Sequence, residues 1–153
     1  MTLLPLPFRV PLEGTVRIEA SAGTGKTYAL ERLIARHILW NGHPVDSVLA
    51  VTFTNAAAAD IRQRLHGFLR RCLAYDGKTA DGDIEILYAG RPAEVSEDQL
   101  RSRLALALSD FDRAAVYTIH GFCQRLLQDY ALDTGQPIPP PVLLEDETAL
   151  RAQ

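Results

Sequence analysis

Short apolar runs alternate with longer stretches of helical periodicity along this chain of 153 residues. Runs of β-branched and apolar residues occur at 16–18, 48–53 and 114–119. Each leads towards a segment whose apolar residues recur every three or four positions, and these segments predict helices. Continuous apolar runs of this length are typical of strands in a parallel sheet, which are buried on both faces. The alternation predicts an α/β fold, a parallel sheet flanked by helices.

Two of the predicted helices, 27–40 and 56–75, are clearly amphipathic. In the first, the apolar face consists of Leu30, Leu33, Ile34 and Ile38. Arg32 and Arg36 lie on the other face. In the second, the apolar face consists of Ile61, Leu65, Phe68, Leu69, Cys72 and Leu73, and the other face carries Arg62, Arg64, Arg70 and Arg71. We interpret these four arginines as a solvated helix surface and not as a binding patch.

Prolines, glycines and capping residues divide the rest of the chain. Three prolines within residues 1–15 argue against a helix there and predict an extended lead-in. The glycine-containing stretch 76–95 reads as a mobile loop with a short helical piece near 84–88. Ser96 and Gln99 have the spacing of a capping box, so a helix should begin there, and a last helix should end near residue 132.

The stretch 18–27 has the composition of a phosphate-binding loop. It follows an apolar run, precedes a predicted helix and ends in Gly25, Lys26 and Thr27. Small residues let the backbone curl until successive N–H groups face phosphate oxygens, and the helix dipole adds partial positive charge. Lys26 would reach the β- and γ-phosphates, and the Thr27 hydroxyl would ligate Mg²⁺. The predicted nucleotide-binding residues are Ala20, Ser21, Ala22, Gly23, Thr24, Gly25, Lys26 and Thr27, with Ala20 where the strict motif has glycine.

Charge and cysteine content narrow the classes of protein that fit. The net charge of −3 creates no global field for nucleic acid, so any contact with DNA must be local. Cys72 and Cys123 belong to no CxxC or Cys/His cluster, which indicates reduced thiols and a cytoplasmic protein. No apolar run approaches the roughly 18 residues that a membrane helix needs. The start of the chain lacks the features of a signal peptide, so we expect no contact with a membrane.

Three motifs in order resemble a known family. The first is the loop 18–27, the second is Thr52-Phe53-Thr54-Asn55 with its flanking residues 51–57, and the third is Thr118-Ile119-His120-Gly121-Phe122 within 117–125. Together they resemble motifs I, Ia and Ib of superfamily 1A (UvrD-like) DNA helicases. The amino-acid sequences of the first and third motifs are most similar to those of the RecB type, the beta subunits of exodeoxyribonuclease V. The resemblance extends over most of the chain, from about residue 11 to 147.

This resemblance implies an ATP-driven motor that moves on single-stranded DNA and feeds a nuclease in a repair and recombination complex. The implied cofactors are ATP and Mg²⁺. The implied partners are single-stranded DNA or duplex ends and the other subunits of a helicase–nuclease complex. The residues implied to contact DNA are Thr52, Phe53, Thr54, Asn55, Thr118, His120 and Phe122. Hydroxyls and amides can donate to phosphate oxygens, and aromatic rings can stack on bases without reading the sequence. For both phenylalanines, the alternative is a packing position in the core.

The resemblance also implies a division of the chain. Residues 1–135 would be the N-terminal part of the first motor domain, a RecA-like P-loop NTPase fold with an incomplete sheet. Residues 136–153 would be a proline-rich exit and the start of the next subdomain. We therefore expect this chain to be the N-terminal piece of a longer protein.

A catalytic carboxylate pair is not recognisable in the chain. Hydrolysis of ATP needs one carboxylate to hold Mg²⁺ and another to orient water, usually at the end of an apolar strand. We reject the acidic run 145–147 for this role, because the prolines at 139–141 leave too little chain for a central strand. We predict no catalytic residue in the 153 residues, weak nucleotide binding at most, and no ATP turnover.

Two alternatives stay open at the level of sequence. One is a self-contained small P-loop kinase or NTPase, whose metal carboxylates would be the acidic run 145–147 or Asp110 and Asp112. The other is a non-catalytic interaction module in which the loop binds ATP and the helices bind a protein partner. Binding of labelled oligonucleotide with steep salt dependence would favour the helicase over both.

Overall fold

The computed structural model describes residues 5–19, 21, 23, 25–78 and 80–131. The elements in chain order are α1 Leu6–Arg9, α2 Lys26–Leu39, β1 Ala50–Thr52, α3 Asn55–Ala74, α4 Gly82–Ala89, α5 Glu97–Ser109, a 3₁₀ turn η1 Phe111–Arg113, β2 Val116–Thr118 and α6 Ile119–Asp129. The long predicted helices and the second and third predicted strands are confirmed. The mixture of helices with a parallel strand pair is an α/β fold, as the sequence predicts.

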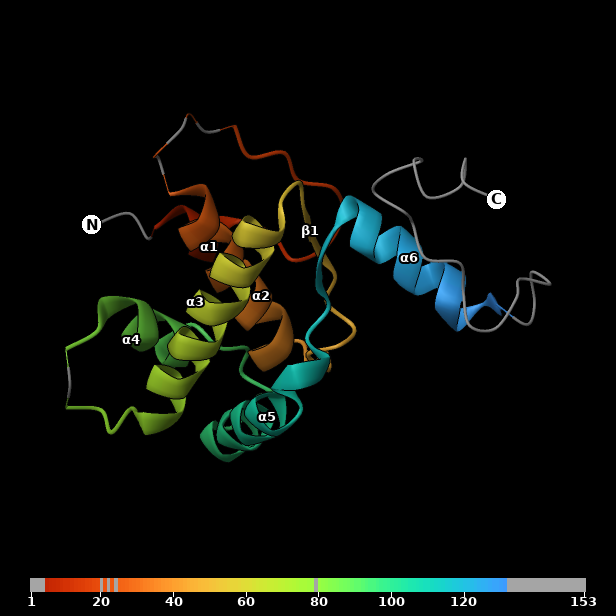
Figure 1. The fold of residues 1–153 in the computed structure, drawn as a ribbon. Coiled ribbons are helices and arrows are strands. Elements are labelled where there is room, and N and C mark those ends of the chain that lie inside the picture. Colours follow the sequence, from red (N-terminus) through yellow and green to blue (C-terminus); the bar gives the residue numbers. More distant parts are fainter. Residues whose placement is uncertain (1–4, 20, 22, 24, 79, 132–153) are drawn as a thin grey trace, which may run out of the picture.

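The two strands pair in parallel, and residue 50 lies opposite residue 116. Helices α2, α3, α4 and α5 gather on one side of this pair, whereas α6 extends away from it (Figure 1). The chain leading to α2 and the starts of α3 and α6 all lie on the upper side in that view. The carboxyl ends of both strands therefore point to the side from which the described chain enters α2 (Figure 1).

The strand predicted at 16–18 is wrong. This segment has no secondary structure in the described part of the chain, and the Val16 side chain is 42% exposed. Arg17 and Glu19 alternate with the apolar residues and pair with each other in solvent, 2.9 Å apart. An apolar side of two residues buries too little surface to hold a strand by itself.

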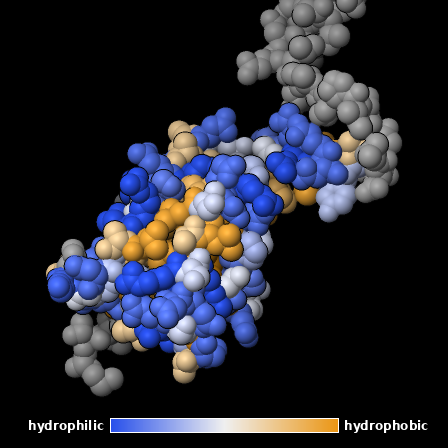
Figure 2. Space-filling model, turned by 90° about the horizontal axis from the view of Figure 1, so that it is seen from below, coloured by the Kyte–Doolittle hydropathy of each residue, from blue (hydrophilic) through white to orange (hydrophobic). Residues whose placement is uncertain are grey.

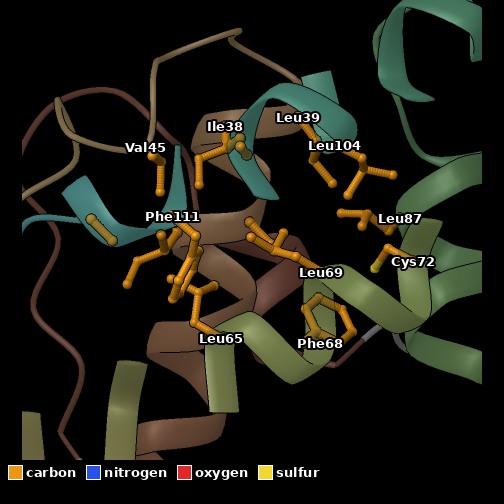
Figure 3. Packing of buried hydrophobic residues seen from close by; sticks show 14 of the residues in the cluster. Ile38, Leu39, Val45, Leu65, Phe68, Leu69, Cys72, Leu87, Leu104 and Phe111 are labelled. Carbon is orange, nitrogen blue, oxygen red and sulfur yellow. The ribbon is translucent and has the colours of Figure 1, made fainter. Parts of the chain in front are cut away.

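The core lies between the helices and one face of the sheet. Figure 3 shows side chains from α2, α3, α4 and α5 meeting there with Phe111 from η1. The largest fully buried side chains are Phe68, Ile38, Leu39, Leu65, Leu69, Leu87, Leu100, Leu104 and Cys72. The apolar face predicted for 56–75 is thus correct in its main members, and Cys72 is a packing residue whose burial raises the pKa of its thiol to about 12.

The lead-in contains a helix that the sequence analysis excluded. Pro7 occupies the first turn of α1, where a missing N–H costs nothing because those donors have no intrahelical partner. Phe8 is buried and helps to anchor the turn. Arg36 of α2 donates to the carbonyl oxygens of Pro7 at 2.5 Å and Val10 at 2.8 Å. The prolines therefore shorten this helix but do not prevent it.

The face of α2 that carries Arg32 and Arg36 is not exposed to solvent at these two residues. Both are buried, together with Glu31. Both side chains can be buried because they have protein partners. Arg36 donates to the α1 segment, and Arg32 forms ion pairs with Glu31 and with Asp83 of α4. A buried charge is stable only where such partners replace water.

Helix α4 is longer and better packed than the short piece expected in a mobile loop. Ile84, Leu87 and Tyr88 are buried, and the Tyr88 hydroxyl donates to the carbonyl oxygen of Cys72. Helix α5 begins with the predicted capping box: Ser96 accepts from the Gln99 amide at 3.1 Å, and the Ser96 amide donates to the Gln99 side chain at 2.9 Å.

The lower face of the molecule is partly apolar. Figure 2 shows a group of apolar side chains surrounded by hydrophilic ones on the side that is seen from below. A hollow beside α5 has Ile38, Val45, Leu106 and Ala107 in its lining. Among the described residues, no helix combines the length and apolar character needed to cross a membrane.

Candidate functional site

Gly23 and Gly25 of the predicted phosphate-binding stretch have the backbone conformation that a tight glycine loop requires. Gly23 has φ of 77° and Gly25 has φ of 88°, both in the left-handed region that side chains other than glycine rarely adopt. Gly25 is the N-cap of α2, so the helix begins at Lys26. The predicted site residues Ala20, Ala22 and Thr24 lie outside the described residues.

The Lys26 side chain folds back over the residues that precede it. Its Nζ donates to the main-chain carbonyl oxygen of Ser21 at 2.6 Å. A hollow of about 440 Å³ is lined by Leu6, Pro7, Ile18, Glu19, Ser21, Gly25, Lys26, Tyr28 and Ala29. The ammonium and the start of α2 contribute positive charge to this hollow, and the Glu19 carboxylate contributes negative charge. Leu6 and Pro7 place the lead-in at the edge of the hollow, in the helix α1 and not in the extended form that was expected.

The strand ends bring the second and third motifs together. Thr52 and Thr118 are register partners in the parallel pair, so they lie side by side at the same end of the sheet. Two threonine hydroxyls cap the helices that follow: Thr54 accepts from the Ala57 amide and Thr118 from the Gly121 amide, each at 3.1 Å. A hydroxyl that accepts in this way still has its own hydrogen to donate, and phosphate oxygens are suitable acceptors.

The remaining predicted DNA residues differ in exposure. Phe53 is 86% exposed, which excludes the core position considered as its alternative. Asn55 and His120 are exposed as well. Phe122 is half-buried, and its ring centroid lies 6.3 Å from that of Tyr117. Phe53 is thus presented to solvent beyond the strand ends, whereas Phe122 combines packing with partial access.

The arginines of α3 are not a uniform solvated surface. Arg62 donates to the carbonyl oxygens of Asp112 at 3.2 Å and Ala114 at 2.7 Å, which ties α3 to the segment before β2. Arg64 pairs with Asp60 on the same helix at 2.7 Å. These guanidinium groups are engaged by protein oxygens, so their positions give no support to an anion-binding patch.

Of the carboxylates that the kinase alternative requires, the two described ones, Asp110 and Asp112, do not line the hollow beside Lys26. Asp110 and Asp112 lie in the connection that precedes β2, at the end of that strand opposite to Thr118. Within the described ranges, no three His, Cys, Asp or Glu side chains are grouped so that they could hold a metal ion. The acidic run 145–147 and the predicted boundary after residue 135 lie outside those ranges.

Sequence reasoning missed a polar network next to the loop. Tyr28, Arg32, Arg36 and Trp40 are spaced four residues apart along α2, and each arginine lies over an aromatic ring of this series. That spacing places the four side chains on one helical stripe and was visible in the sequence. The partner Asp83 was not recognisable, because it is 51 residues away from Arg32 in the chain.

Comparison with known proteins decides the family. The sequence pattern of the UvrD/REP helicase N-terminal domain matches residues 8–153. The chain belongs to this family. Membership agrees with the order of the three motifs and with the α/β fold. The UvrD-like resemblance stated from the motifs is therefore confirmed.

Relatives of the RecB type support a narrower assignment within the UvrD/REP family. The chain is 40% identical over 157 residues to the RecBCD enzyme subunit RecB of Escherichia coli, covering 96% of this chain and 13% of the relative. It is 39% identical to the RecB subunit of Mycobacterium tuberculosis, covering 78% of this chain and 11% of that relative. For Haemophilus influenzae RecB the identity is 37%, over 86% of this chain and 12% of the relative. The chain thus spans about one eighth of the length of these curated relatives.

Proposed function

We propose that this chain binds the phosphates of ATP through residues 20–27, as part of a RecA-like P-loop NTPase fold. The support is the pair of left-handed glycines, the Lys26 ammonium at the hollow and the start of α2 behind it. An incoming phosphate would draw the ammonium away from the Ser21 carbonyl, because a phosphate carries more negative charge than a carbonyl oxygen.

We assign Mg²⁺ to the Thr27 hydroxyl in this proposal. Thr27 lies in the first turn of α2 and is partly exposed, which suits a ligand shared with phosphate oxygens and water. A bound Mg²⁺ would neutralise charge on the β- and γ-phosphates. The Thr27 hydroxyl alone does not hold Mg²⁺, so binding of Mg²⁺ should depend on bound nucleotide. This agrees with the prediction that the chain does not turn over ATP.

We further propose that single-stranded DNA runs over the carboxyl ends of β1 and β2. The observation that carries this proposal is the register of the two strands, which sets Thr52 beside Thr118 with the exposed Phe53 next to them. Threonine hydroxyls would donate to the DNA backbone, and the phenylalanine would stack on a base whatever its identity. The predicted contacts at Thr54, Asn55, His120 and Phe122 belong to the same end of the sheet.

For the longer protein we propose an ATP-dependent DNA helicase and exonuclease that acts in double-strand break repair and recombination. The support is family membership and the RecB relatives, which are named as subunits of the RecBCD enzyme. The proposed partners are accordingly single-stranded or duplex-end DNA and the other subunits of such a complex. No described feature favours the kinase or the interaction module over this proposal.

Two titrations on the purified 153-residue chain test the proposal. A fluorescent ATP analogue should bind weakly in the presence of Mg²⁺, and Lys26→Ala should abolish that binding, since the ammonium supplies the main charge at the hollow. A labelled oligothymidine should bind with an affinity that falls steeply with salt and is similar for other base compositions. Lys26-dependent ATP hydrolysis by this chain, or nucleotide binding without any affinity for oligonucleotide, would contradict it.

A further inference from the structure

Helix α2 starts without the support that other helices of this molecule receive. Its N-cap is Gly25, which has no side chain to accept from the first-turn amides. In contrast, α3, α4, α5 and α6 each begin at a residue whose side chain accepts such a bond, namely Thr54, Asp81, Ser96 and Thr118. The first turn of a helix frays readily because its amides lack intrahelical partners. The turn that carries Lys26 and Thr27 therefore needs another anchor.

That anchor is provided by α4. The Tyr28 hydroxyl donates to one oxygen of Asp83 at 2.7 Å. Arg32 donates to the other oxygen from Nε at 3.0 Å, and its Nη2 lies 2.9 Å from the same oxygen in an ion pair. Asp83 is thus held by two residues of α2 that lie one turn apart, and the bonds fix the first two turns of α2 against α4.

The network is largely buried, and a single guanidinium serves two carboxylates. The Arg32 guanidinium lies 4.2 Å from the ring centroids of both Tyr28 and Phe68, and it also pairs with Glu31 at 2.5 Å. Burial, then the hydrogen bond to Asp83, raises the pKa of Tyr28 to about 12. A charge-assisted bond in such surroundings is stronger than one exposed to water.

We infer that Asp83 is a positioning residue for the nucleotide site, which acts by holding Tyr28 and thereby the first turn of α2. This inference rests on the proposed function, because the residues positioned are the proposed phosphate and Mg²⁺ ligands Lys26 and Thr27. Tyr28 follows them directly and also lines the hollow in which Lys26 lies. If this turn is less rigid, Lys26 and Thr27 sample more conformations, and the affinity for a triphosphate falls.

The test compares Asp83→Ala with Asp81→Ala in the 153-residue chain. Asp81 caps the same helix α4 but does not bond to Tyr28, so its variant reports the general effect of a weaker α4. We expect Asp83→Ala to raise the Kd for a fluorescent Mg·ATP analogue about five-fold or more, and Asp81→Ala to change it less than about two-fold. Asp83→Asn, whose amide oxygen can still accept from Tyr28, should recover part of the affinity. Equal losses for the two alanine variants would overturn the inference.

A second probe distinguishes binding of the phosphates from binding of the base and sugar. Magnesium tripolyphosphate has only the phosphate part, so Asp83→Ala should weaken its competition with the fluorescent analogue by the same factor. A loss seen with ATP but not with tripolyphosphate would contradict positioning of the phosphate ligands. Tyr28→Phe removes the same hydrogen bond while the ring stays in place, and it replaces Asp83→Ala should that variant fail to fold.

Hydrogen exchange distinguishes failure of this inference from failure of the proposed function. If the unsubstituted chain binds neither probe, the proposed nucleotide binding is wrong for this chain. The anchoring is still measurable, because Asp83→Ala should speed exchange of the Ala29 amide, which makes the first bond of α2 to the Gly25 carbonyl. No faster exchange than in Asp81→Ala would refute the positioning role by itself.

Discussion

Phe53 and Phe122 each lie shortly after a strand of the same sheet, yet their surroundings differ. The ring of Phe122 packs near Tyr117, whereas Phe53 is 86% exposed. A large aromatic side chain left in water at the tip of a strand loses the burial that usually stabilises it. A nucleic-acid base stacked on the ring of Phe53 would bury this exposed apolar surface.

Replacing Phe53 with alanine should weaken binding of a labelled oligothymidine by roughly 1–3 kcal/mol, the usual contribution of one stacked base. The free energy of unfolding should change by less than about 0.5 kcal/mol, because the ring is not part of the core. Fluorescence anisotropy and urea denaturation measure the two quantities. Leu106→Ala is the matched control, since Leu106 is 60% exposed on α5, away from the strand ends. Equal affinities for both variants would exclude stacking at Phe53.

At the scale of elements, the starts of α3, α4, α5 and α6 are specified locally, whereas α1 and α2 have no side-chain cap. Each capping residue binds an amide only three positions ahead, as Ser96 does with Gln99. Such signals can be read from a short stretch of sequence. The cap of α5 is complete in both directions and should contribute measurably to stability.

Ser96→Ala should lower the free energy of unfolding by about 1 kcal/mol, because two amides of α5 lose their organised partners. Ser102→Ala is the control in the same helix, where the hydroxyl only bonds back to the Asp98 carbonyl oxygen at 2.8 Å. That change should cost little, since alanine favours a helix interior. Chemical denaturation followed by circular dichroism compares them. A larger loss for Ser102→Ala would show that the capping box is not what stabilises α5.

The same distinction between local and distant determinants explains what the sequence could predict. Helices 27–40 and 56–75, the capping box and two strands follow from periodicity and caps. The burial of Arg32 and Arg36 involves partners far away in the chain, Asp83 and the α1 segment. The strand at 16–18 fails for a local reason, because its apolar side is too short. For the candidate site, the glycine conformations and the adjacency of Thr52 and Thr118 agree with expectation, whereas the anchor from α4 had no local signal.

At the scale of the whole molecule, charge burial links stability to pH. Burial, then the neighbouring His43 and Arg36, lowers the pKa of His37 below its usual value of 6.5. The folded state therefore prefers neutral His37. Its contribution to stability is present above pH 6.5 and is lost as the pH falls through the lower pKa of the folded state.

We expect the free energy of unfolding to decrease when the pH is lowered from 7 towards 5, and His37→Gln to make this decrease smaller. His43→Gln removes only a lesser cause of the shift and should have a weaker effect in the same direction. Urea denaturation at a series of pH values measures both slopes. Identical slopes in the unsubstituted chain and His37→Gln would show that this histidine does not couple folding to protons.

Trp40 gives the molecule an intrinsic spectroscopic reporter, because it is the one tryptophan of the sequence. Its indole N–H donates to the Leu87 carbonyl oxygen of α4 at 3.0 Å, and the Arg36 guanidinium lies 4.4 Å from its ring. Its emission should therefore respond to separation of α4 from α2 before the core itself opens. A shift of the emission maximum at denaturant concentrations where the circular dichroism is unchanged would mark that local undocking.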